Sequence, residues 1–137
     1  MVATGNREET ETSRNARVAS VVLHIKHEMR MSKRRRTMKW SYKTIVDAPR
    51  DSFGIYAIWC RHNGKCIYVG EASKRSIGER LGDHWRKSHN QTLQLWIRAF
   101  GSDLDLCYAS VEKPRIAVAE RRLIRLWNPE ANVQHKR

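Results

Sequence analysis

The most constraining feature of the sequence is a pair of short runs rich in aromatic and β-branched residues, at 53–61 and 65–69. The residues between them, His62, Asn63 and Gly64, have the composition of a tight turn, in which glycine supplies a left-handed backbone conformation. Two such runs around a short connection predict a β-hairpin. We expect the rest of the chain to be organised around these two antiparallel strands.

The length of the turn decides which side chains of the hairpin lie on the same face, because strand side chains alternate between faces. A two-residue turn would place Tyr56 and Tyr68 on opposite faces. A three-residue loop with a bulge would place both tyrosines on one face and would pair Cys60 with Cys66. The residues alone leave both registers open.

The charge of the chain predicts its class of partner. The 137 residues suffice for one domain with its own core, and they carry a formal charge of +13 and a pI near 10.3. Lysine and arginine gain affinity for polyanions by neutralising phosphates and releasing counterions, so nucleic acid is the first candidate. An anionic membrane surface is the second, although no apolar run approaches the roughly 20 residues of a membrane span.

The start of the chain and its cysteines indicate a compartment. Residues 1–17 are polar and contain no hydrophobic block, which does not fit a secretory signal. Three cysteines, an odd number, fit a reducing environment better than a disulfide scaffold. We therefore expect an intracellular protein, cytoplasmic or, in a eukaryote, nuclear.

The region before the hairpin is expected to hold a polar start and one helix. Residues 1–14 have almost no apolar content and predict disorder. Between residues 15 and 31, apolar side chains recur at helical spacing and form one stripe: Val18, Val21, Val22, Ile25 and Met29. This stripe packs either on its own domain, which we favour, or against a second copy in a homodimer.

The segments that link this helix to the hairpin are basic and then irregular. The run at 33–36 includes Arg34 and Arg35, which are candidates for contact with the DNA backbone. Residues 40–51 show no clear period and are expected to be irregular, with at most one short strand.

A helix is expected after the hairpin, at residues 76–87. Ile77, Leu81 and Trp85 are spaced by four and predict its buried side. Arg80 and His84 are also four apart, so they project together from a neighbouring face of the helix.

The remaining sequence predicts a helix at 92–100, a strand at 103–110 and a last helix that Pro114 opens. The expected apolar stripe of this last helix comprises Ile116, Ala117, Leu123, Ile124 and Trp127. Glu120 lies within that stripe. A carboxylate that faces a core is costly unless a metal or a charge compensates it, so Glu120 is either a metal ligand or the partner of a buried arginine.

Several of these residues occur in the order of a known family signature. Gly54-Ile55-Tyr56 is followed after eleven residues by Tyr68-Val69-Gly70. This pair of tripeptides resembles the motif of the GIY-YIG nuclease family, which includes homing, restriction and repair endonucleases. The resemblance extends from Phe53 to Asn132 through further landmarks in the family order: Arg80, His84, Glu120, Pro129 and Asn132.

The resemblance implies a fold. The family core is an α+β domain with a small three-stranded antiparallel sheet flanked by helices, in the order β-β-α-α-β-α. This chain would add an N-terminal helix, with residues 1–50 preceding a nuclease domain at 51–137. Because both family tyrosines line one site, the resemblance also implies the three-residue hairpin loop.

The resemblance further implies a metal-dependent endonuclease that hydrolyses DNA phosphodiester bonds. Glu120 would bind one Mg²⁺ or Mn²⁺, Arg80 would hold the phosphate oxygens and Tyr56 would act as the general base. Supporting roles fall to Tyr68, which would position water or bind phosphate, to His84, which would take or orient the proton of Tyr56, and to Asn132, which would anchor the site.

Further residues are expected to bind the substrate: Gly70, Lys74, Arg75, His89, Arg34 and Arg35. Two alternatives remain open from the sequence. The chain could be a basic nucleic-acid-binding module without turnover, or a subunit of a larger nuclease complex.

Overall fold

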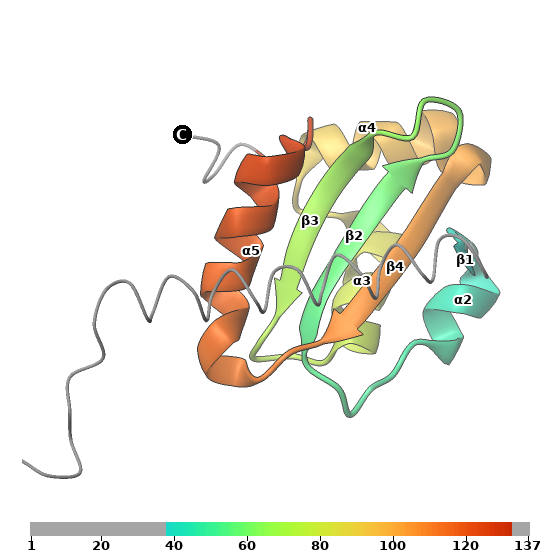
Figure 1. Cartoon of the computed structure of the whole chain (residues 1–137). Helices are drawn as coiled ribbons and strands as arrows, with labels where there is room; N and C mark the ends of the chain where they lie inside the picture. The colour runs from blue at the N-terminus through green and yellow to red at the C-terminus, as the bar shows by residue number, and fades with distance from the viewer. Residues whose placement is uncertain (1–37, 133–137) are drawn as a thin grey trace, which may run out of the picture.

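The computed structural model of the chain describes residues 38–132. Within them, a four-stranded antiparallel sheet is covered by helices (Figure 1). The strands are β1 (Met38–Lys39), β2 (Gly54–Cys60), β3 (Cys66–Ala72) and β4 (Leu104–Ser110), in the spatial order β1-β4-β2-β3. The helices are α2 (Tyr42–Asp47), α3 (Ile77–Lys87), α4 (Gln91–Phe100) and α5 (Lys113–Trp127), and a short 3₁₀ turn (Gly101–Asp103) precedes β4.

The α+β class and the order of the predicted elements are confirmed, and two elements were missed. The sheet has a fourth strand, β1, which pairs with β4. The segment predicted to be irregular contains α2, which begins at a capping box of Ser41 and Thr44. Neither element could be predicted from hydrophobic periodicity, because β1 has two residues and α2 has six, which are too few to display a period.

Some of the predicted features fall outside residues 38–132, which the structure describes. They are the N-terminal helix, its proposed dimer contact, and the basic residues Arg34 and Arg35. The division of the chain near residue 51 stays a prediction, although β1 and α2 pack into the same core as the later elements. Among residues 38–132, no helix has the length and apolar character needed to cross a membrane.

The sheet is buried on both faces, and each face has its own hydrophobic cluster. One face carries the cluster with residues of α2, α3 and α4: Ile45, Tyr56, Ile58, Ile77, Leu81 and Leu93. The opposite face packs on α5, which lies beside β3 at the left of Figure 1, through Ile55, Val69, Ile116, Leu123 and Ile124. β3 forms an edge of the sheet, so side chains from α3 on one face and from α5 on the other can come close to each other around this strand.

Two predicted core positions are wrong. Trp85 is 37% exposed, although its ring contacts that of Trp40 at 5.9 Å between centroids, because the short α2 covers only part of α3. Ala117 is exposed and Ala119 is buried in its place. Ile77, Leu81 and Ile116 are fully buried, as predicted.

The register of β2 and β3 places both tyrosines on one face. Tyr56 pairs with Gly70 and Ile58 pairs with Tyr68, so Tyr56 and Tyr68 point to the same side of the sheet. Their ring centroids are 6.1 Å apart. This is the tyrosine arrangement that the three-residue loop predicted.

The turn itself differs from that prediction. The amide of Cys60 donates to the carbonyl of Lys65 at 2.9 Å, which closes a four-residue loop at 61–64 with Gly64 at φ 67°. A bulge near the turn then shifts the register, so that Cys66 pairs with Trp59 rather than with Cys60. The extra loop residue and the bulge compensate each other, and the tyrosine register is preserved.

Gly82, in the middle of α3, can be replaced at a gain in stability. A Cβ atom there would meet the guanidinium of Arg86 at 3.4 Å, an ordinary contact with a flexible side chain. Glycine costs about 1 kcal/mol relative to alanine inside a helix. We expect Gly82→Ala to raise the free energy of unfolding by about 0.5–1 kcal/mol in urea titrations. A loss of stability would show that the backbone of α3 is strained at this position.

Candidate active site

The site lies along β3, where β2 and α3 contribute to one face and α5 to the other. Next to Tyr68, a pocket of about 430 Å³ opens toward solvent. Its lining comes from β3, from α3 and from the start of α4: Tyr68, Arg80, His84, His89, Asn90, Gln91 and Thr92. The structure thus brings together four residues that were predicted from the sequence: Tyr68, Arg80, His84 and His89.

Tyr56 is fully buried behind this pocket. Its hydroxyl oxygen lies 2.8 Å from Nε2 of His84. Its ring lies directly over Gly70, where a Cβ atom would come within 2.2 Å of Tyr56 Cζ. Burial and the neighbouring Tyr68 raise the pKa of Tyr56 well above its usual value, so this phenol is protonated in the metal-free protein.

His84 is held between two hydroxyl groups. Its Nε2 faces Tyr56, and its Nδ1 lies 2.8 Å from the hydroxyl of Ser88, which is buried at the end of α3. Ser88 also accepts a hydrogen bond from the amide of Asn90 at 3.2 Å. Burial, aided by the charge of Arg80, lowers the pKa of His84 to about 4, so the imidazole is neutral near pH 7.

Arg80 carries the positive charge of the site. It is half-buried, and its charge acts on both Tyr56 and Tyr68 by opposing the rise in their pKa values. Within residues 38–132 its one ion pair is a long contact of 3.8 Å to Asp83, which also pairs with Arg75 and Arg86 at 2.7 and 2.9 Å. The guanidinium of Arg80 therefore retains most of its capacity to bind an anion.

Glu120 reaches the site from α5 and is half-buried. Among the described residues, no arginine lies within ion-pair distance of its carboxylate, so the sequence alternative of a buried salt bridge finds no support there. Burial, and then the like charge of Glu71, raise the pKa of Glu120 to about 7. Its charge in turn raises the pKa of Tyr68, which ties Glu120 to the site.

This environment fits a divalent cation. A half-buried carboxylate without a cationic partner gains from a hard metal ion, which prefers oxygen ligands. No group of three or more histidine, cysteine or acidic side chains gathers anywhere in residues 38–132. A metal at Glu120 would consequently complete its coordination with water and phosphate oxygens, as Mg²⁺ commonly does.

Asn132 fixes the edge strand. Its amide group donates to the carbonyl of Val69 at 2.9 Å and accepts from the amide of Val69 at 2.8 Å. The adjacent Ala131 donates to the carbonyl of Ile67 at 2.8 Å and accepts from the side chain of Asn90 at 2.6 Å. The segment after α5 therefore extends the hydrogen bonding of β3 and ties it to the start of α4.

The predicted substrate contacts fall into three groups. His89 is exposed and lines the pocket, and Lys74 is exposed in the loop after β3. Arg75 is paired with Asp83 at 2.7 Å and with Glu79 at 3.6 Å, which reduces its availability to phosphate. Gly70 lies beneath the ring of Tyr56, so it acts by admitting that ring rather than by offering its own surface.

Ser88 and Glu71 lie at the site but were not predicted from the sequence. Ser88 follows His84 by four residues, a spacing that places two side chains on one helix face, and this signal was available. Glu71 directly follows the second tripeptide, but no periodicity places it near Glu120, because the two lie on different elements.

Comparison with known proteins identifies the fold and the family of the chain. The family model of the GIY-YIG catalytic domain matches residues 52–132. Among solved structures, the GIY-YIG N-terminal endonuclease domain of UvrC from Thermotoga maritima, bound to magnesium, is 22% identical and has a TM-score of 0.50. The match covers 66% of this chain and 93% of that domain.

Two point mutants of the same Thermotoga maritima domain, also bound to the divalent cation, are 21% and 22% identical. Each match covers 67% of this chain and 93% of the mutant domain, with a TM-score of 0.50. No curated protein sequence matches the chain. The family match spans more than half of the sequence and includes both tripeptides, so the chain belongs to the GIY-YIG nuclease family.

Proposed function

We propose that this protein is a metal-dependent endonuclease that hydrolyses phosphodiester bonds in DNA. The observation that carries the proposal is a group of side chains at the edge of the sheet. The bonded pair of Tyr56 and His84 lies beside Arg80, and Glu120 is half-buried and forms no ion pair with an arginine of residues 38–132. A site that only bound phosphate would gain nothing from Glu120, because its negative charge repels the ligand. The magnesium bound to the UvrC domain supports the same reading.

Glu120 would hold Mg²⁺ or Mn²⁺. When bound, the metal supplies charge neutralisation for the phosphate and for the departing oxygen. Arg80, which protrudes into the pocket beside Tyr68, would bind the non-bridging oxygens of the same phosphate. The two cationic groups would then approach the phosphate from different elements, α5 and α3.

Tyr56 is fully buried, so the proton of the attacking water would reach it through the hydroxyl of Tyr68, which lines the pocket, while the proton of Tyr56 passes to Nε2 of His84. The 2.8 Å separation suits such a transfer, and the neutral imidazole has a free lone pair at Nε2 when Nδ1–H donates to Ser88. The tautomer with a proton on Nδ1 is our assignment. Tyr56 would not need to exist as an isolated phenolate, which its raised pKa disfavours.

The substrate itself would strengthen this proton relay. Arg80 is the second cause of the lowered pKa of His84, after burial. A phosphate bound to Arg80 would offset that positive charge and make His84 more basic. Neutralisation of the Glu120 carboxylate would lower the pKa of Tyr56, because the negative charge of Glu120 is one of the causes that raise it. Proton transfer would thus become favourable once the DNA is in place.

Metal removal tests this function. We expect the full chain to convert supercoiled plasmid to nicked or linear forms with Mg²⁺, and to lose at least about 99% of this rate in excess chelator, because a metal contributes several kcal/mol to such reactions. Added Mn²⁺ should restore cutting. A gel-shift assay in chelator is the control for DNA binding.

Two results would contradict the proposal. Equal cutting with and without chelator would exclude a metal-dependent reaction. DNA binding without cutting, on plasmid, on branched substrates and on a pool of random sequences, would favour the binding-module alternative.

A further inference from the structure

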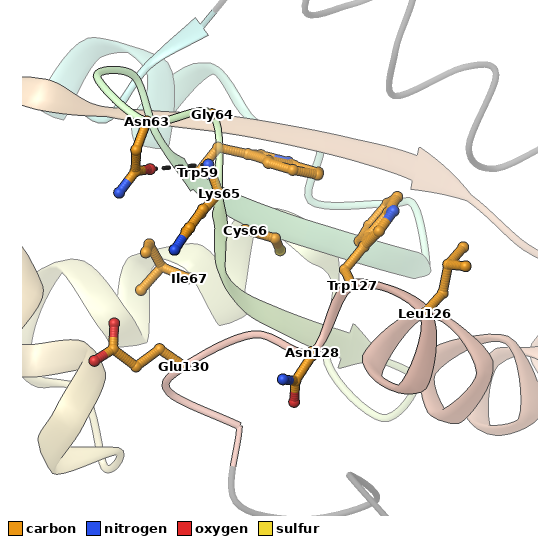
Figure 2. Close-up of a pocket in the computed structure, with 10 residues that line it drawn as sticks. All are labelled: Trp59, Asn63, Gly64, Lys65, Cys66, Ile67, Leu126, Trp127, Asn128 and Glu130. Carbon is orange, nitrogen blue, oxygen red and sulfur yellow. Dashed lines mark hydrogen bonds between the residues drawn. The ribbon is translucent and has the colours of Figure 1, made fainter.

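A second pocket, of about 710 Å³, lies between the β2–β3 turn and the end of α5 (Figure 2). Its lining comes from these two regions: Trp59, Asn63, Gly64, Lys65, Cys66, Ile67, Leu126, Trp127, Asn128 and Glu130. None of these residues has a part in the proton relay or the predicted metal site. The volume falls in the range of pockets that hold small organic groups.

The chemistry of the walls is that of a nucleotide site. The half-buried rings of Trp59 and Trp127 contact each other edge to face, with 4.9 Å between centroids. Figure 2 shows these two rings on one side of the pocket and the side chains of Lys65 and Glu130 on the other. Aromatic faces stack on nucleobases, a lysine binds phosphate, and a carboxylate accepts hydrogen bonds from base amino groups.

The position of the pocket relates it to the predicted metal ligand. Trp127 follows Glu120 by seven residues on α5, which is close to two helical turns, so the two side chains lie on similar faces of one helix. A rise of about 1.5 Å per residue separates them by roughly 10 Å along the axis. At about 3.4 Å per nucleotide of a stacked strand, this distance corresponds to roughly three nucleotides, and to fewer where the strand is unstacked and extended.

We propose that this pocket binds an unpaired nucleobase of the DNA substrate, a few nucleotides from the phosphate that is cut. The base stacks on Trp127, Lys65 binds its phosphate, and Glu130 with Asn128 bonds the edge of the base. A base inside a duplex is stacked and paired and has no access to such a pocket. The inference rests on the proposed nuclease function and gives it a substrate class, DNA that carries a single-stranded segment, such as a flap or a bubble.

Binding without cutting tests the pocket separately from catalysis. The probes are a fluorescein-labelled 15-nucleotide single strand and the matching duplex, titrated with the full chain in chelator and followed by anisotropy. We expect Trp127→Ala to weaken single-strand binding by about 5- to 150-fold, the effect of one base–aromatic stack, and duplex binding by less than about twofold.

Lys65→Glu keeps the test valid if Trp127→Ala fails to fold, since Lys65 is exposed. Lys43→Glu is its matched control, because it makes the same charge change on α2, away from the pocket. We expect Lys65→Glu to reduce the ratio of single-strand to duplex affinity at least about threefold and Lys43→Glu to leave the ratio unchanged, because a general loss of charge weakens both probes alike.

An unchanged ratio in folded Trp127→Ala and Lys65→Glu would overturn the proposal. That result combined with metal-dependent cutting by the wild type would reject the pocket and leave the nuclease function intact. A changed ratio in a chain that never cuts DNA would support the base site and reject the nuclease function.

Discussion

Replacement of Glu120 by glutamine is expected to slow Mg²⁺-dependent plasmid cutting by about a thousandfold. Glutamine has nearly the same shape but carries no negative charge, so it loses the metal while it preserves the packing of α5. A loss of about 4 kcal/mol of transition-state stabilisation corresponds to this factor. The measurement is the initial nicking rate of supercoiled plasmid at saturating Mg²⁺, at equal concentrations of the variant and the wild type.

A stability measurement separates loss of the metal ligand from loss of the fold. In the metal-free protein the pKa of Glu120 is raised from 4.5 to about 7, so the folded state binds the proton more tightly than the unfolded state does. The wild type therefore loses stability as the pH rises from about 4.5 to about 7, whereas glutamine does not titrate. At pH 8 in chelator, Glu120→Gln should be more stable than the wild type by about 1–3 kcal/mol, with little difference near pH 4.

Glu112→Gln is the matched control, because it makes the same chemical change at an exposed position at the start of α5. This control should cut DNA at the wild-type rate and show no such gain in stability. Wild-type cutting by Glu120→Gln would reject Glu120 as the metal ligand. A slow variant that is also less stable at pH 8 would show that Glu120 supports the fold instead.

The long elements of the fold were predictable because each repeats a period over enough residues. The helix at 77–87 and the strand at 104–110 show their alternation in the sequence, and both appear within a residue of the predicted bounds. β1 and α2 were not predictable in this way. Tertiary contacts determine where these two elements form: β1 pairs with β4, and Ile45 of α2 is buried against the sheet. Such contacts are not visible in a local sequence pattern.

The residues of the candidate site could be selected from the sequence, whereas their surroundings could not. The resemblance selected Tyr56, the apolar stripe of the last helix singled out Glu120, and helical spacing placed Arg80 with His84. The sequence could not show that the hairpin has a four-residue loop and a bulge that together preserve the tyrosine register, because amino-acid composition does not determine the number of residues in a turn. The approach of Glu71 to Glu120 depends on how α5 lies against β3, and this is a property of the folded chain.

Replacement of Gly70 by alanine is expected to abolish most of the activity through Tyr56. The added Cβ would come within 2.2 Å of Tyr56 Cζ and 2.3 Å of its hydroxyl oxygen, and Tyr56 is fully buried, so the ring has to tilt away. That movement breaks the 2.8 Å bond to His84, and a small misplacement of a catalytic group costs about a hundredfold in rate. Overpacking should also lower the free energy of unfolding by about 1–3 kcal/mol.

A double-mutant cycle with Tyr56→Leu tests whether the clash with Tyr56 is the cause. Leucine has no ring over position 70, so Gly70→Ala should cost less than about 0.5 kcal/mol in that background, and the difference is the coupling energy. Gly82→Ala is the glycine control, since it adds the same methyl group on α3 without such a contact and should leave cutting unchanged. If Gly70→Ala destabilised both backgrounds equally, the glycine would serve the backbone of β3 and not the seating of the Tyr56 ring.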